Sequence, residues 1–236
     1  TGTSSAFTLD TSYTEDIINA TGGGTAPTNP KFVKSFANHM FYAGMSDAIS
    51  TITFSGPFTE DDFDTGGGSI VVGATITGLK VFRDDLFIFC ETRIFKLSGS
   101  ALANFAVSDV TRDIGCINGD TIQEFAGDLI FLGPDGLRTV AGTEKIGDVE
   151  LGVISRPIQR RFTELNYNTV AEKISSVVIK AKTQYRIFFA NQGAESDCTG
   201  VIAVFRGDRW EYSDMRGIKP NCGDSGYISD IEFTVH

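Results

Sequence analysis

Residues 74–99 read ATITGLKVFRDDLFIFCETRIFKLSG, and this stretch decides the fold. It holds three short apolar runs, at 76–82, 86–90 and 94–97, which are separated by the charged tripeptides RDD and ETR. Runs of this length that are rich in Ile, Val, Phe and Leu are typical of strands, and polar breaks of two or three residues are typical of hairpin turns. The stretch therefore predicts an antiparallel meander.

The same pattern recurs along the chain. Further apolar runs lie at 32–39, 40–43, 51–54, 129–132, 137–140, 174–183, 185–190 and 201–205. The meanders repeat at a spacing of about 40 residues, which is typical of propeller blades of four strands. We therefore expect an all-β fold, a β-propeller-like array of antiparallel four-stranded blades that need not be complete, with a β-sandwich as the alternative.

The chain divides into an N-terminal arm and one large domain. Residues 1–30 are dominated by Thr, Ser, Gly and Asn, so we expect an extended arm or linker that is ordered only where it lies on something else. Residues 31–236 are expected to form the propeller-type domain. Its approximate blades are 32–68, 69–115, 116–155 and 156–217, with the start of another at 226–236.

The expected fifth blade has only its opening strand before the sequence ends. An open strand leaves unpaired edges that invite pairing. Either more sequence follows in the natural protein, or a neighbouring chain supplies the missing strands, or the fold is the sandwich.

The composition argues for a large core and against nucleic-acid binding. Hydrophobic residues make up 41% of the 236 residues, and the formal net charge is -10. A chain this acidic repels the phosphate backbone unless its basic residues cluster. The densest basic stretch, residues 155–161 (SRPIQRR), is expected to be a solvated loop or rim whose arginines pair with neighbouring carboxylates. Residues 156–165 could also form about two helical turns. No apolar run approaches the roughly 18 residues that a membrane span needs.

The four cysteines do not form a recognisable framework. Cys90 lies in an apolar run and is expected to be buried, and Cys116 follows a turn at Gly115. Cys198 and Cys222 lie in polar segments and could form a disulfide, although free thiols are the simpler expectation. No Cys/His cluster indicates zinc.

No group of residues stands out as catalytic. His39, at a predicted hairpin, is expected to be a turn residue, and no G-x-S-x-G motif precedes a helix. Residues 60–64 (EDDFD) are the best candidate for calcium, but they lack the spacing of an EF-hand, so a solvated loop is the simpler interpretation. Trp210 is expected to pack on an outer strand. We therefore predict that the chain is not an enzyme, with no catalytic, cofactor or metal residues and no cofactor.

Several stretches resemble the β-propeller of virion proteins from tailed bacteriophages. They are NHMFYAG at 38–44, STITFS at 50–55, the runs between 76 and 99, LIFLGPDGL at 129–137 and YRIFF at 185–189. The resemblance covers roughly residues 32–236, and proteins of this group build the tail nozzle, or tail tubular protein B, and related neck and tail components.

This resemblance implies a structural role in a virion, in the tail or neck, after assembly in the host cytoplasm. It implies a ring of identical copies, often sixfold, in contact with adjacent phage tail or neck proteins. Genomic DNA would pass through such a ring without specific binding, since an acidic channel offers no attraction for phosphates. The alternative is a tail propeller that binds carbohydrate or a receptor, which would require aromatic and paired acidic residues at its central axis.

Overall fold

A computed structural model describes residues 24–141, 153–160, 162, 174–189, 198–206, 209–218, 220, 222–228 and 231–235. The described part of the chain is all-β, as predicted, and its strands form five antiparallel sheets. Most of the predicted arm, residues 1–23, lies outside the described residues. No helix in the described ranges is long and apolar enough to cross a membrane.

Each sheet is built from strands that follow one another in the sequence. Sheet 1 contains β1 (Phe32–Phe36), β2 (His39–Ala43), β3 (Thr51–Phe54) and β4 (Gly68–Val71). Sheet 2 contains β5 (Ile76–Phe82), β6 (Asp85–Cys90), β7 (Ile94–Ser98) and β8 (Ala106–Thr111). Sheet 3 contains β9 (Gln123–Phe125), β10 (Asp128–Gly133) and β11 (Gly136–Thr139). Sheet 4 contains β12 (Ile174–Ile179), β13 (Gln184–Phe189), β14 (Cys198–Arg206) and β15 (Arg209–Arg216). Sheet 5 is the hairpin of β16 (Asp224–Ile228) and β17 (Ile231–Val235).

Four short 3-10 helices lie between the described strands. They are η1 (Leu102–Asn104), η2 (Gly119–Thr121), η3 (Arg156–Ile158) and η6 (Lys180–Lys182).

The boundary between the first two units differs from the prediction. The strand β4 pairs with β3 and completes sheet 1, whereas the sequence placed residues 69–72 at the start of the second unit. Gly68 lies directly against the ring of Phe54, and a Cβ at this position would lie 2.8 Å from its Cζ atom. The glycines at 66–68 therefore lead back into the same sheet and do not separate two units.

The first hairpin also turns earlier than predicted. The turn residues Ala37 and Asn38 have positive φ angles of 49° and 65°, the signature of the two-residue turn that matches strand twist. His39 is consequently the first residue of β2 and pairs with Phe36, so it is not a turn residue.

The fifth and third units differ from the expectation in their strands. Residues 226–236 were predicted to be a single opening strand, but residues 224–235 contain both strands of a hairpin. The carboxylate of Glu232 accepts hydrogen bonds from the backbone N–H groups of Lys180 (2.6 Å) and Ala181 (2.7 Å), which ties this hairpin to sheet 4. In the third unit, residues 148–154 are predicted from the sequence to form the last strand. They fall mostly outside the described residues, but Val153 forms one antiparallel bridge to Arg138.

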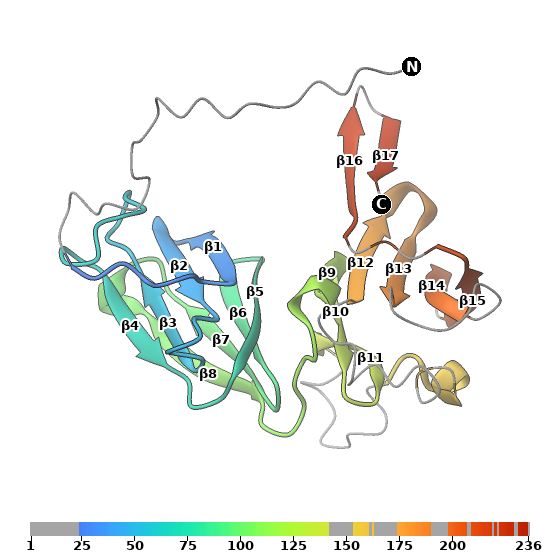
Figure 1. The fold of residues 1–236 in the computed structure, drawn as a ribbon, viewed down its shortest axis with the longest axis horizontal. Coiled ribbons are helices and arrows are strands. Elements are labelled where there is room, and N and C mark those ends of the chain that lie inside the picture. Colours follow the sequence, from blue (N-terminus) through green and yellow to red (C-terminus); the bar gives the residue numbers. More distant parts are fainter. Residues whose placement is uncertain are drawn as a thin grey trace, which may run out of the picture.

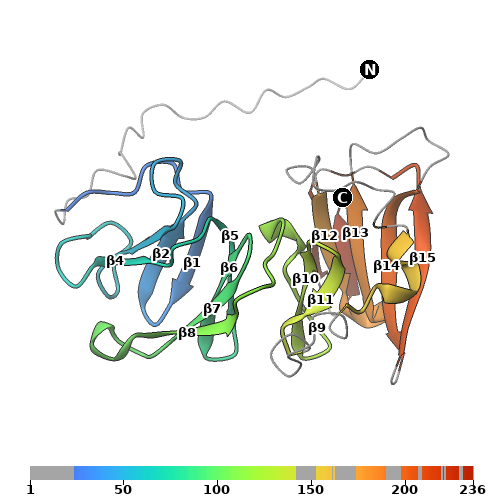
Figure 2. The same ribbon diagram turned by 90° about the horizontal axis from the view of Figure 1, so that it is seen from below.

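Sheets 1 to 4 pack face to face in the order of the sequence (Figures 1 and 2). One apolar cluster lies between sheets 1 and 2, a second between sheets 2 and 3, and a third between sheets 3 and 4. Each inner sheet is therefore covered on both faces, as the blades of a propeller are. This stacking explains the composition of β6, in which Leu86 and Ile88 face sheet 1 while Phe87 and Phe89 face sheet 3.

The first strands of the sheets come together. In the described structure β1 contacts β5, β5 contacts η2, and β12 contacts η2, β9 and β16. These strands therefore lie at the common inner edge of the sheets, which is the place of the central axis in a propeller. The arrangement is propeller-like, and it creates a surface to which five separate parts of the chain contribute.

Candidate functional site

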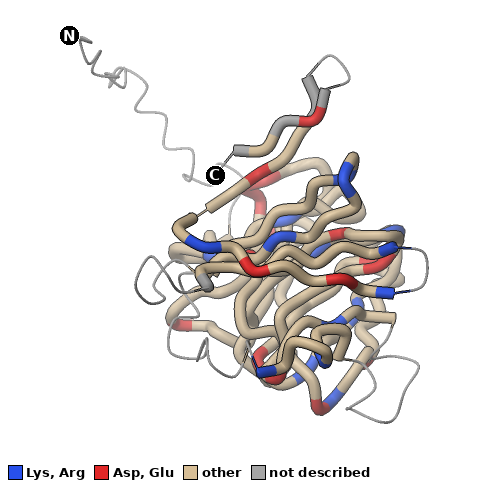
Figure 3. Tube along the Cα trace, turned by 90° about the vertical axis from the view of Figure 1, so that its right-hand side faces the viewer, with Lys and Arg blue, Asp and Glu red and all other residues tan. Residues whose placement is uncertain are grey.

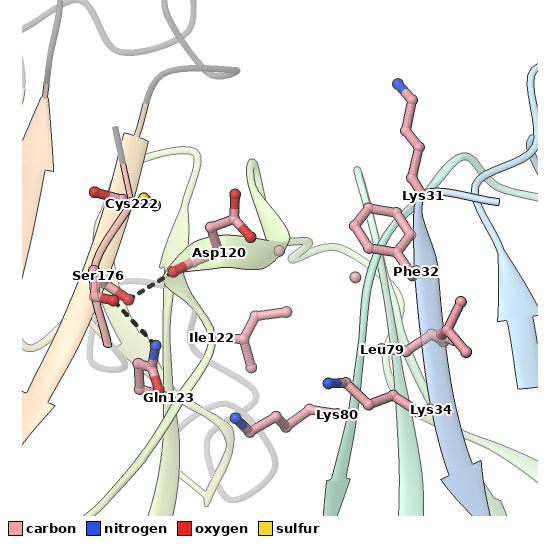
Figure 4. A pocket seen from close by; sticks show the side chains of 15 residues that line it. Lys31, Phe32, Lys34, Leu79, Lys80, Asp120, Ile122, Gln123, Ser176 and Cys222 are labelled. Carbon is pink, nitrogen blue, oxygen red and sulfur yellow. Dashed lines mark hydrogen bonds between the residues drawn. The ribbon is translucent and has the colours of Figure 1, made fainter. Parts of the chain in front are cut away.

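The candidate site is a cavity of about 370 Å³ at this inner edge, which we call the axial cavity. Its lining comes from the first strands of sheets 1 to 4 and the residues beside them, from η2, and from residues 222 and 223, which precede β16 (Figure 4). The lining residues are Lys31, Phe32, Val33, Lys34, Gly78, Leu79, Lys80, Gly119, Asp120, Ile122, Gln123, Ser175, Ser176, Cys222 and Gly223. A second cavity of about 490 Å³ adjoins it and shares Lys31, Phe32, Gly119 and Asp120.

The backbone is held close at the bottom of this space by two glycines. A Cβ on Gly119 would lie 2.4 Å from the carbonyl oxygen of Thr77 and 3.1 Å from the Cα atom of Gly78. Only a residue without a side chain fits such an approach of two backbones. Gly78 and Gly119 therefore join sheet 2 to η2 and leave the space beside them open.

One wall of the axial cavity is fixed by hydrogen bonds. The hydroxyl of Ser176 in β12 donates to the carbonyl oxygen of Asp120 at 2.7 Å. The side-chain amide of Gln123 donates to the carbonyl oxygen of Ser176 at 3.2 Å. The buried hydroxyl of Tyr185 adds a third link between sheets 3 and 4 by donating to the carbonyl oxygen of Thr121 at 2.9 Å. This wall is therefore preorganised before any ligand arrives.

The opposite wall carries two lysines that extend into the cavity (Figure 4). Lys34 in β1 lies on the same face of its strand as Phe32 and Phe36, which pack toward sheet 2. Lys80 in β5 lies between Leu79 and Val81, which pack toward sheet 1, so alternation directs Lys80 toward sheet 3. Both ammonium groups consequently meet the space between the sheets.

The surroundings of Lys80 disfavour the charged form of its side chain. Burial lowers the pKa of Lys80, and the neighbouring Lys34 lowers it further. Glu124 and Asp224 oppose this shift, while Lys180 reinforces it. Neither Lys34 nor Lys80 forms an ion pair with another described residue. The structure therefore holds two cationic groups near each other, one of them half-buried.

The side chain of His39 is part of the buried core. Its Nδ1 donates to the carbonyl oxygen of Ser55 at 2.6 Å, and its ring packs edge-on against Phe54 and Phe105. It is buried in the aromatic cluster between sheets 1 and 2 and does not line the axial cavity. The prediction of a turn residue was wrong because the turn formed one residue earlier.

The acidic loop at residues 60–64 does not gather its carboxylates around a point. Asp62 Oδ1 accepts hydrogen bonds from the backbone N–H groups of Asp64 and Thr65, both at 3.0 Å, and these bonds lower the pKa of Asp62. In the part of the chain that the structure describes, no three His, Cys, Asp or Glu side chains are grouped as metal ligands. The carboxylate of Asp62 therefore stabilises the turn.

The cysteines differ in their surroundings. Cys90 and Cys116 are buried free thiols, and burial raises the pKa of each to about 12. Cys222 is an exposed free thiol at the axial cavity, so the disulfide considered with Cys198 is not formed. The side chain of Cys198 lies outside the described residues.

Two further predictions from the sequence can be placed. Trp210 packs against Phe125 and Phe205, with ring centroids 5.5 and 5.1 Å away, so it is a packing aromatic on an outer strand as predicted. In the basic stretch, Arg156 and Arg160 are exposed around the 3-10 turn η3, which agrees with a solvated segment.

Lys34 and Lys80 were not singled out in the sequence. The available signal was a lysine inside the first strand of two successive units, at residues 32–36 and 76–82. Alternation gives only the face of the strand on which such a lysine lies, and the convergence of the sheets brings both lysines into one cavity.

The comparisons with known proteins do not add a family. No family model matches the chain, and no curated protein matches it significantly.

Proposed function

We propose that this chain is a structural protein of a bacteriophage virion, located in the tail or neck, where copies of it assemble into a ring. Adjacent tail or neck proteins would be its other partners. The observation that carries the proposal is the outer face of sheet 1, the first sheet of the stack, whose strand residues are uncharged and which is exposed at Val33 and Val71.

This outer face of sheet 1 follows from strand register. The cross-strand pairs place one set of side chains opposite the core face. The set is Val33, Ser35, Met40, Tyr42, Thr51, Thr53, Ser69 and Val71. None of these strand residues is charged, although the chain contains 50 Asp, Glu, Lys and Arg residues. The acidic loop lies against the face at Tyr42, whose hydroxyl donates to the carbonyl oxygen of Glu60 and whose ring packs against Phe63. Val33 is 39% exposed and Val71 is 71% exposed.

The face is suited to packing against another protein surface. Sheets 2 and 3 are covered on both sides by the neighbouring sheets, whereas this face is the one at which the stack begins. Exposed faces without charge commonly mark interaction sites, and heterologous contacts of this kind generate rings. The resemblance of the strand sequences to phage propellers supplies the virion class.

Surface charge elsewhere fits an assembly that does not hold DNA tightly. Acidic and basic positions are intermixed along the strands on the side of the molecule seen in Figure 3, and the formal net charge is -10. In this proposal the DNA channel forms between copies, so the axial cavity, which lies within one chain, is not part of it.

The carbohydrate-binding alternative receives less support. Sugar sites usually present an aromatic platform, and Trp210 is the single tryptophan of the chain. Its ring is engaged with two phenylalanines between sheets 3 and 4. The structure therefore gives this alternative no particular advantage.

The test is the native mass of the purified chain, measured by light scattering over a range of concentrations and followed by electron microscopy. We expect a ring-sized species, and we expect Val33→Lys combined with Val71→Lys to reduce it to smaller species. Val107→Lys is the matched control, because Val107 is 42% exposed but lies on β8. A monomer at every concentration, or equal disruption by the control, would contradict assembly through this face.

A further inference from the structure

We propose that the axial cavity binds a small molecule that carries a phosphate monoester, with the ammonium groups of Lys34 and Lys80 holding the phosphate. This inference does not depend on the proposed role in a virion, because it concerns a cavity within one chain.

The charge of the cavity lining departs from that of the protein. The lining contains three lysines and one aspartate, with no arginine and no glutamate, in a chain whose formal net charge is -10. Like charges that approach each other in a partly buried space destabilise the free protein. An anion between Lys34 and Lys80 would remove that repulsion and stabilise both charges.

The type of cation indicates the type of anion. Lysine binds phosphate as a point charge, whereas arginine is preferred where a planar carboxylate is held by two parallel hydrogen bonds. A phosphate monoester carries a charge of about -1.5 to -2 at neutral pH, which matches two ammonium groups. A single carboxylate would neutralise only one of them.

The size and the polar wall restrict the rest of the ligand. A cavity of about 370 Å³ is near the lower end of the range for small-molecule sites and is too small to admit a nucleic-acid duplex. Asp120 lies on the wall across from the two lysines (Figure 4) and would repel a second anionic group. We therefore expect the remainder of the ligand to be neutral and able to donate hydrogen bonds, as a hydroxyl group can.

The experiment is isothermal titration of the full chain with inorganic phosphate and with glycerol phosphate, in a phosphate-free buffer near pH 7.5. We expect one site per chain that saturates below about 10 mM. Lys34→Gln and Lys80→Gln should each weaken binding about tenfold or more, since a charge-assisted contact is lost. Lys182→Gln makes the same change of charge at an exposed residue of η6 outside the cavity, and should change affinity less than twofold.

Each outcome decides the proposal. Absence of saturable binding in the unmodified chain, or equal weakening by Lys182→Gln, would overturn it. A short DNA duplex is titrated in parallel, and displacement of phosphate by the duplex would assign the site to a nucleic-acid backbone instead. Circular dichroism verifies that each variant is folded. If Lys80→Gln does not fold, Lys34→Gln, at an exposed residue, still tests the site.

Discussion

The interfaces between the sheets and the axial cavity share several strands, yet the cavity contains charged and polar groups that the interfaces lack. In β5, Leu79 and Val81 pack between sheets 1 and 2, while Lys80 between them reaches the cavity. The interfaces are filled with Phe, Leu and Ile, whereas the cavity lining combines lysines, glycines and polar groups with Phe32, Val33, Leu79 and Ile122. Packing of opposed faces stabilises the array, and the cavity lies at the inner edge, where the first strands come together.

The largest effect on stability is expected in the apolar interface between sheets 2 and 3. Phe89 is fully buried and packs against Phe131, with ring centroids 5.3 Å apart. Phe89→Ala should lower the free energy of unfolding by about 3–5 kcal/mol, because it removes buried contacts and leaves a void. Urea denaturation measures the loss. Phe58→Ala, at a residue that is 83% exposed, is the control and should change stability by less than about 0.5 kcal/mol. Similar losses in both variants would show that the sheets are not held together by this core.

The second-largest effect on stability is expected where the backbones of β5 and η2 approach each other beside the axial cavity. Gly119→Ala would bring a Cβ to 2.4 Å from the carbonyl oxygen of Thr77, so the backbones of β5 and η2 must separate. We expect a loss of about 1–3 kcal/mol, as for other overpacked sites. Gly226→Ala is the control, because a Cβ there meets no atom within 4 Å. A stability unchanged by Gly119→Ala would mean that sheets 2 and 3 are not joined at this point.

A smaller effect is expected from the hydrogen bond between sheet 4 and η2. Tyr185→Phe removes the donor to the carbonyl oxygen of Thr121 in a fully buried setting, and should cost about 1–2 kcal/mol in thermal or urea denaturation. Tyr42→Phe is the comparison, because its hydroxyl donates to the carbonyl oxygen of Glu60 near the surface, where water can replace it. Equal losses of stability in Tyr185→Phe and Tyr42→Phe would show that burial does not make the Tyr185 hydrogen bond contribute more than the exposed one.

The smallest effect concerns how the contribution of Lys80 to stability changes with pH. Burial, Lys34 and Lys180 lower the pKa of Lys80, while Glu124 and Asp224 oppose them. Between this lowered pKa and the ordinary value of 10.5, the unfolded chain binds more protons, so stability attributable to Lys80 rises with pH. Lys80→Met should therefore melt at a higher temperature than the unmodified chain near neutral pH.

The measurement is thermal melting from pH 7 to 10.5, with Lys182→Met as the control. The advantage of Lys80→Met should shrink as the pH rises, because Lys80 loses its proton in the unmodified chain. An advantage that is the same at every pH would assign the effect to apolar packing and not to charge.

Much of the fold could be predicted because strands and turns are local. The apolar runs at 76–82, 86–90 and 94–97 correspond closely to β5, β6 and β7, since their side chains are dictated by the two covered faces. The predictions from sequence failed where the pairing of strands, and not the local sequence, determined which sheet a segment joins. The strand β4 joined sheet 1 because its residues pair with β3, and residues 224–235 formed a hairpin where one strand was expected.

The sequence by itself determined the all-β class, the succession of meanders, the buried Cys90 and the packing role of Trp210. These follow from hydrophobic periodicity and turn composition, which act over a few residues. Only the tertiary structure decided that Lys34 and Lys80 share one cavity with Asp120 and Ser176. Their meeting depends on how five sheets stack and where their first strands converge, and no pattern within a single strand contains that information.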